Sequence, residues 1–109
     1  MLGIKVTIER ITQESFPGFV ECRFADAAGK WHVFEEKVPV VTVEDLHASS
    51  EYPRPGVIGC LLVATRVGPD GRELLTVDTE QPWAIESKAG ETHFEVSREQ
   101  VIEFEHGAG

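Results

Sequence analysis

The segment TVDTEQPWAIES, residues 76–87, places carboxyl groups beside an indole ring. Asp78 and Glu80 precede Trp83, and a carboxyl group desolvated by an aromatic ring can work as an acid or a base with a second one. The same oxygens could bind a hard cation such as Mg²⁺, although no established metal-loop pattern is present. We therefore hold open two interpretations: a small-ligand or enzymatic pocket, or solvated acids next to a core tryptophan that shares its parity with Ile85.

The cysteines and histidines lack the spacing of a metal or redox site. Cys22 and Cys60 form no Cys-x-x-Cys pair, and the four histidines form no His-x-His or His-x-x-x-His pair. Both cysteines have apolar neighbours, and burial disfavours the reactive thiolate. No glycine-rich phosphate loop or nucleophile elbow occurs. The sequence predicts no metal, no cofactor and no catalytic residue, and it favours a protein that is not an enzyme.

The charge balance favours a protein partner over nucleic acid. The chain of 109 residues has 19 acidic and 10 basic side chains, with a formal net charge of −9. An acidic surface repels phosphate and speeds encounter with basic proteins. Nucleic-acid binding would require the basic residues of the first strands to converge on one face; these are Lys5, Arg10, Arg23 and Lys30.

The N-terminus and the hydropathy pattern predict a cytoplasmic protein without a membrane span. The first residues, MLGIKVTIER, have neither a basic segment nor an apolar signal region. No apolar run approaches the roughly 18 residues that a spanning helix needs. In the cytoplasm both cysteines are expected to be reduced. The sequence gives no indication of the oligomeric state.

Two-residue alternation of apolar and polar side chains predicts an all-β, antiparallel domain of about seven short strands. The run VIGCLLVATRV is apolar on both faces, which predicts a central strand covered on both sides. Turns are expected at DAAGK, GPDGR and KAGE. The strands are expected within 4–8, 20–24, 31–38, 57–67, 73–79, 83–87 and 92–96, with a last one ending at Phe104.

The segment between the third and fourth strands is the least regular. Thr42 and Asp45 have capping-box spacing, so we expect one helical turn from Thr42 to Leu46. Residues 49–56 contain two serines, two prolines and a glycine, which predicts the longest exposed loop. Tyr52 and Arg54 are residue types that dominate interface energies.

The C-terminal segment FEVSREQVIEF contains Ser97 and Gln100 at capping-box spacing, which predicts a single helical turn between two strands. This order resembles the ending of small barrels of the Src-homology-3 kind. The resemblance implies a partly open β-barrel. Peptide-binding members line a groove with aromatic and acidic residues, and here only Tyr52 and Trp83 could be so placed. We expect one domain over residues 1–109, with 105–109 as a frayed tail.

These observations favour a small acidic, non-catalytic module that binds another protein. Its predicted contact residues are Tyr52, Arg54, Trp83, Asp78 and Glu80. Two alternatives stay open: a small-ligand or enzymatic domain with its pocket near Trp83, and an immunity-like inhibitor of a basic toxin.

Overall fold

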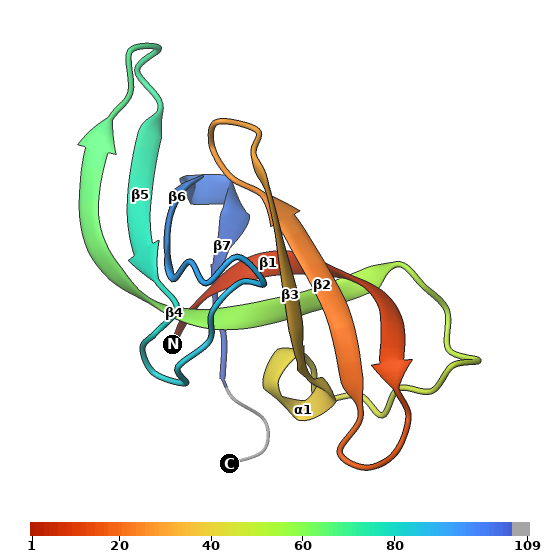
Figure 1. Cartoon of the computed structure of the whole chain (residues 1–109). Helices are drawn as coiled ribbons and strands as arrows, with labels where there is room; N and C mark the ends of the chain where they lie inside the picture. The colour runs from red at the N-terminus through yellow and green to blue at the C-terminus, as the bar shows by residue number, and fades with distance from the viewer. Residues whose placement is uncertain (106–109) are drawn as a thin grey trace.

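A computed structural model describes residues 1–105 of the chain. It consists of seven antiparallel strands in one curled sheet, a half-barrel, and the predicted all-β class is confirmed (Figure 1). The strand order is β3-β2-β1-β4-β5-β6, and β7 pairs with β1. The strands are β1 (Leu2–Gln13), β2 (Phe19–Ala25), β3 (Trp31–Lys37), β4 (Arg54–Val67), β5 (Glu73–Asp78), β6 (His93–Ser97) and β7 (Val101–Glu103).

The two short helices are single turns, α1 (Val38–Val41) and the 3-10 turn η1 (Arg98–Gln100). The predicted strand, turn and strand at the C-terminus are confirmed, and the backbone amide of Ser97 donates to Gln100 Oε1 at 3.0 Å. Gln100 also donates to the carbonyl of Ala25 at 2.6 Å, which ties η1 to the end of β2. The predicted frayed tail, apart from Glu105, lies outside the described residues.

The first two strands bury the side chains that alternation predicts. Ile4, Val6 and Ile8 of β1 are buried, and β2 buries Val20, Cys22 and Phe24. On β3, alternation alone does not decide whether Trp31 with Val33 or Phe34 with Val38 faces inward. The inward side chains are His32 and Phe34, whereas Trp31 is exposed and stacks against the guanidinium of Arg23 at 4.5 Å.

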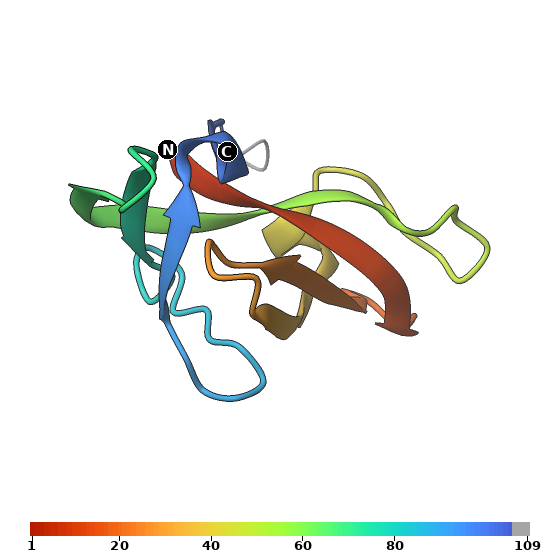
Figure 2. The ribbon, with the colours of Figure 1, turned by 90° about the horizontal axis from the view of Figure 1, so that it is seen from above.

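The curled sheet is partly closed where the β2–β3 hairpin meets β6, as both views show (Figures 1 and 2). The rings of Phe24, Phe34 and Phe94 lie with centroids 5.4 to 6.0 Å apart. Two backbone hydrogen bonds cross the same gap, from Ala27 to the carbonyl of Glu95 and from Lys88 to that of Val33. Side-chain packing and single hydrogen bonds, instead of a continuous strand ladder, therefore bring these edges together.

The helical turn predicted at 42–46 is wrong in position. The turn is α1, four residues earlier, where Pro39 occupies the first turn and Thr42 is the C-terminal cap. Proline is favoured in a first helical turn because its missing amide would have no partner there. The Thr42 hydroxyl instead accepts the amide of Glu44 at 3.2 Å, so it shapes the loop that follows.

The strand predicted over 83–87 is also wrong. No strand lies between Asp78 and His93; residues 81–83 form a turn, and Ala84 has a φ of 54°. The hydroxyl of the buried Thr79 donates to the carbonyl of Ile85 at 2.7 Å. This bond folds the chain back on itself, so Ile85 reaches the core without joining a strand ladder.

The fourth strand ends at Val67 as predicted, but it begins earlier than predicted and its second half is uncovered. It begins at Arg54, where a loop was expected, and Pro55 lies opposite Thr7 of β1. Residues 54–60 pair with β1 and 61–67 pair with β5 on the other edge. All seven residues from Leu61 to Val67 are exposed, so the expected coverage on both faces is wrong for this half.

Candidate functional site

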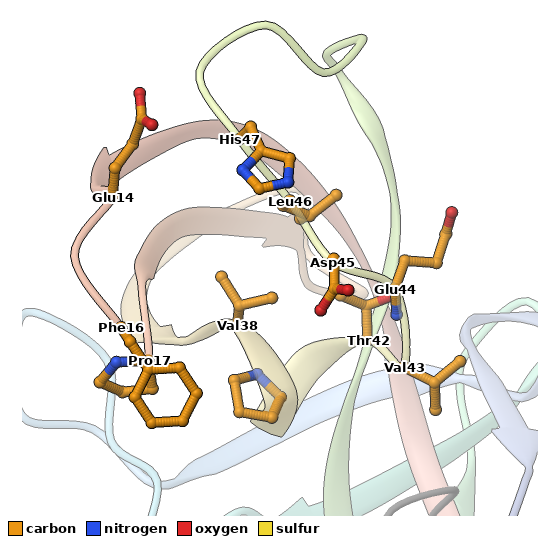
Figure 3. Close-up of a pocket in the computed structure, with 11 residues that line it drawn as sticks. Glu14, Phe16, Pro17, Val38, Thr42, Val43, Glu44, Asp45, Leu46 and His47 are labelled. Atoms are coloured by element: carbon orange, nitrogen blue, oxygen red, sulfur yellow. The ribbon is translucent and has the colours of Figure 1, made fainter.

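A cavity of about 400 Å³ lies where the β1–β2 loop meets α1 and the segment after it (Figure 3). Figure 3 shows Val38 at the centre, with Phe16 and Pro17 on one side and Asp45 and Leu46 on the other. We call this cavity the acidic groove. It is lined by Glu14, Phe16, Pro17, Val38, Pro39, Thr42, Val43, Glu44, Asp45, Leu46 and His47.

The groove has a buried apolar floor and exposed apolar walls. Val38 and Leu46 are buried and belong to the main core, so the floor is fixed by packing. Phe16 is 98% exposed and Val43 is 79% exposed. Two large apolar side chains in full contact with water beside a cavity are typical of a surface that binds another molecule.

The charged side chains around the groove are carboxylates. Glu14, Glu44 and Asp45 line it, and the lining includes no lysine or arginine. Glu44 is paired with Arg54, whose Nη2 lies 2.5 Å from Glu44 Oε2. Within residues 1–105, neither Glu14 nor Asp45 forms an ion pair, so two carboxylates remain available to a cation.

Tyr52 and Arg54, predicted as contact residues, support the groove from behind. The Tyr52 hydroxyl donates to the carbonyl of His47 at 2.8 Å, and its ring packs against the core. Arg54 bonds to Glu44, and its side chain is mostly buried. Both residues hold the segment that lines the groove, whereas that segment itself presents Val43 and Asp45 to solvent.

Trp83, Asp78 and Glu80, the other predicted contact residues, do not line the groove. Trp83 is partly buried and packs against the core, with its ring 6.3 Å from that of Phe104. Asp78 accepts the backbone amide of Glu80 at 2.9 Å, and its carboxylate lies 3.7 Å from His93 Nε2. A second cavity, of about 240 Å³, lies next to α1 and Phe104, and none of these three residues lines it either.

Trp83 covers a glycine of the neighbouring strand. A Cβ atom built on Gly59 would lie 2.6 Å from Trp83 Cζ3, closer than real contacts allow. We predict that Gly59→Val displaces the indole and lowers the free energy of unfolding by about 1 to 3 kcal/mol. Chemical denaturation followed by tryptophan emission checks this, and a variant with the parent's emission maximum and stability would contradict the contact.

Neither cysteine offers a nucleophile. Both are buried, as expected. Burial, followed by the negative charge of Glu36, raises the pKa of Cys22 to about 12. Burial, followed by Asp78, raises that of Cys60 to about 11. Among the described residues, no group of three or more histidine, cysteine, aspartate or glutamate side chains could hold a metal ion.

A buried pair, Asp26 with His32, was missed by the sequence analysis. His32 Nε2 lies 2.8 Å from Asp26 Oδ2, and the histidine packs against Phe94 with ring centroids 4.7 Å apart. Burial alone would raise the pKa of Asp26. Hydrogen bonds from His32 and from the amides of Lys30 and Ala28 outweigh it and lower that pKa. The pair orders the β2–β3 turn. The sequence spacing of Asp26 and His32 matches no motif that would have indicated the pair.

Replacing this carboxylate tests its contribution to stability. Asp26→Asn keeps an acceptor for the two amides and removes the charge, so we predict a loss of about 1 kcal/mol at neutral pH. A lowered folded pKa stabilises the protein above the unfolded value of about 3.9, and the gain disappears as the pH falls through the folded pKa. Urea denaturation should therefore show the parent and variant converging below that pH; a constant difference would contradict the charge effect.

Three of the four basic residues considered for nucleic-acid binding are paired with carboxylates, and within residues 1–105 the fourth, Lys5, is exposed and in no ion pair. Arg10 lies 3.3 Å from Glu21, Arg23 lies 2.9 Å from Glu9, and Lys30 lies 3.4 Å from Glu91. Each of these cations is therefore balanced by a carboxylate, which leaves little net positive charge for phosphate binding.

Comparison with known proteins adds no assignment. No protein-family model, no curated protein and no solved structure matches this chain. Within residues 1–105, none of the helices has the length and apolar character that crossing a membrane requires. The likeness to Src-homology-3 barrels stays a prediction.

Proposed function

We propose that this protein is a non-catalytic, protein-binding module whose acidic groove holds a basic segment with one large apolar side chain. The observation that carries the proposal is the combination of exposed Phe16 and Val43 with unpaired Glu14 and Asp45 around one cavity. A cavity of about 400 Å³ is large enough for a leucine or aromatic side chain and its backbone.

The apolar part of the groove supplies the binding energy in this proposal. An anchor seated between Phe16 and Val43 would remove both side chains from water, and apolar burial contributes roughly 25 cal/mol per Å². Val38 and Leu46 below them are already packed in the core, so the floor needs no reordering. Anchors in preformed pockets are the usual hot spots of interfaces.

The carboxylates supply orientation and partner choice. Lysine or arginine next to the anchor would meet Glu14 and Asp45, and the net charge of −9 would speed the encounter. An acidic or neutral partner would leave both carboxylates partly desolvated without compensation. The enzymatic alternative has less support, because Trp83, Asp78 and Glu80 do not line this cavity.

Selection from a random peptide library on the purified, immobilised protein tests the proposal. We expect enriched peptides to carry a large apolar residue flanked by lysine or arginine. Val43→Ser should weaken the selected peptides, whereas Val67→Ser, at an equally open valine on β4, should not. Enrichment of acidic or uncharged peptides, or equal binding by both variants, would contradict the proposal.

A further inference from the structure

The second half of β4 is an open sheet edge. Leu61–Val67, which we call the edge segment, hydrogen-bonds to β5 on one side. Residues 54–60 of β4 use the opposite edge to pair with β1, and β1 begins at Leu2, opposite Cys60. No strand of the described chain pairs with that opposite edge beyond Cys60. Figure 1 shows β4 and β5 rising from the half-barrel with this part of β4 outermost.

The edge segment has no lysine, no proline and no inward charge to block edge pairing; its one protective feature is a β-bulge between Leu62 and Ala64. Leu61, Leu62, Val63 and Val67 are 54%, 42%, 53% and 70% exposed. The single charged residue is Arg66, whose guanidinium binds Glu95 through two hydrogen bonds of 2.7 and 2.8 Å. Edge strands are normally protected by lysine, proline or inward charges. The register shift between Leu62 and Ala64 twists the strand but leaves its outer amides and carbonyls unpaired.

We propose that two copies of this chain pair antiparallel along the edge segment, about a two-fold axis at Ala64. Antiparallel pairing of a strand with itself is isologous, because the same surface serves both copies. In this register Ala64 of one copy lies opposite Ala64 of the other, Leu62 lies opposite Arg66, and Val63 lies opposite Thr65. The exposed apolar side chains of Leu61, Leu62, Val63 and Val67 then lie along the joint between the two copies. The β4–β5–β6 sheets of the two copies become one continuous sheet.

The size and charge of the edge favour a second copy. The exposed side chains and backbone of seven residues would bury at most roughly 500 Å² per copy, about 1,000 Å² in total, which is the lower limit for a specific interface. Because Glu95 balances Arg66, the edge carries little of the net charge of −9, so repulsion at the axis is small. A dimer of this size is expected to dissociate on dilution. It leaves the acidic groove free, so it is independent of the proposed function.

Sedimentation velocity of the full chain over a range of concentrations tests the pairing. The parent is expected to double its mass as concentration rises. Val63→Lys should keep it monomeric, because two ammonium groups would meet near the axis. Ala89→Lys adds the same charge at an exposed residue outside β4 and outside the acidic groove, and it should dimerise like the parent. A parent that stays monomeric, or Val63→Lys dimers as stable as the parent's, would overturn the proposal.

Cysteine cross-linking tests the register. Ala64→Cys places one thiol from each copy across the axis, within the range of a disulfide, while Cys22 and Cys60 are buried and cannot compete. Mild oxidation should cross-link Ala64→Cys into a covalent dimer, and Ala89→Cys, an exposed alanine elsewhere, should remain monomeric. Equal cross-linking of both variants would overturn the register. An extended peptide that binds the edge of a monomeric parent would assign the edge to another protein instead.

Discussion

Phe34→Ala is expected to lower the free energy of unfolding by about 3 to 5 kcal/mol. The ring is fully buried, and it contacts Phe24 and Phe94 where β2 and β3 meet β6. No continuous ladder closes that junction, so the aromatic side chains carry most of its packing. Removing one ring leaves a cavity that the neighbouring strands can fill only partly. Urea denaturation followed by circular dichroism measures the loss.

Phe16→Ala is the matched control for this prediction. It deletes the same atoms from a ring that is 98% exposed, and surface substitutions of this kind usually change stability by less than about 0.5 kcal/mol. Equal losses in Phe16→Ala and Phe34→Ala would mean that the aromatic cluster does not hold the half-barrel together.

The second large effect is expected on binding. Glu14→Lys combined with Asp45→Lys should weaken a selected basic peptide at least about tenfold, because two attractive contacts become repulsive. Most of the change should appear in the association rate and should shrink at high salt. Surface plasmon resonance at two ionic strengths measures both quantities.

Glu80→Lys combined with Glu86→Lys is the control for overall charge. Both residues are exposed, and the change in net charge is the same, but the new lysines lie near Trp83 and away from the groove. If this control weakens the peptide as much as Glu14→Lys with Asp45→Lys, long-range attraction alone explains the binding. The groove would then have no special role.

The elements that could be predicted are those whose local pattern matches their environment. β1 and β2 each turn one face toward the core and the other toward solvent. Two-residue alternation therefore identified Ile8 and Cys22 as inward side chains. The turn at Arg98–Gln100 was predictable because Ser97 and Gln100 satisfy each other within four residues. In both cases the decisive interactions are close in the sequence or repeat along it.

The errors arise where the decisive contact leaves no periodic pattern in the sequence. A continuous apolar run has the same sequence pattern whether the strand is covered on both faces or lies at an open edge. The run from Leu61 to Val67 was therefore assigned to the interior. The alternation around Trp83 predicted a strand, but the hydrogen bond from Thr79 to Ile85 forms a loop instead. The pairing of distant strands decided the first outcome, and a local hydrogen bond between residues six apart decided the second.

The acidic groove could not be recognised from spacing. Its walls come from the β1–β2 loop, α1 and the segment after α1, and the sheet brings these segments together. The sequence did mark the loop around Tyr52 and Arg54 as a contact region. Those side chains bond to Glu44 and to the carbonyl of His47, which line the groove, and their role as contact residues stays a prediction.

Titration of the isotope-labelled protein with a selected basic peptide, followed by ¹H–¹⁵N spectra, shows directly which residues the peptide contacts. Binding in the groove predicts the largest shifts at the backbone amides of 14–18 and 40–47, with small changes around Asp78 and Trp83. Shifts centred on Asp78, Glu80 and Trp83, with residues 14–18 unchanged, would contradict the acidic groove as the binding site and would favour the alternative pocket.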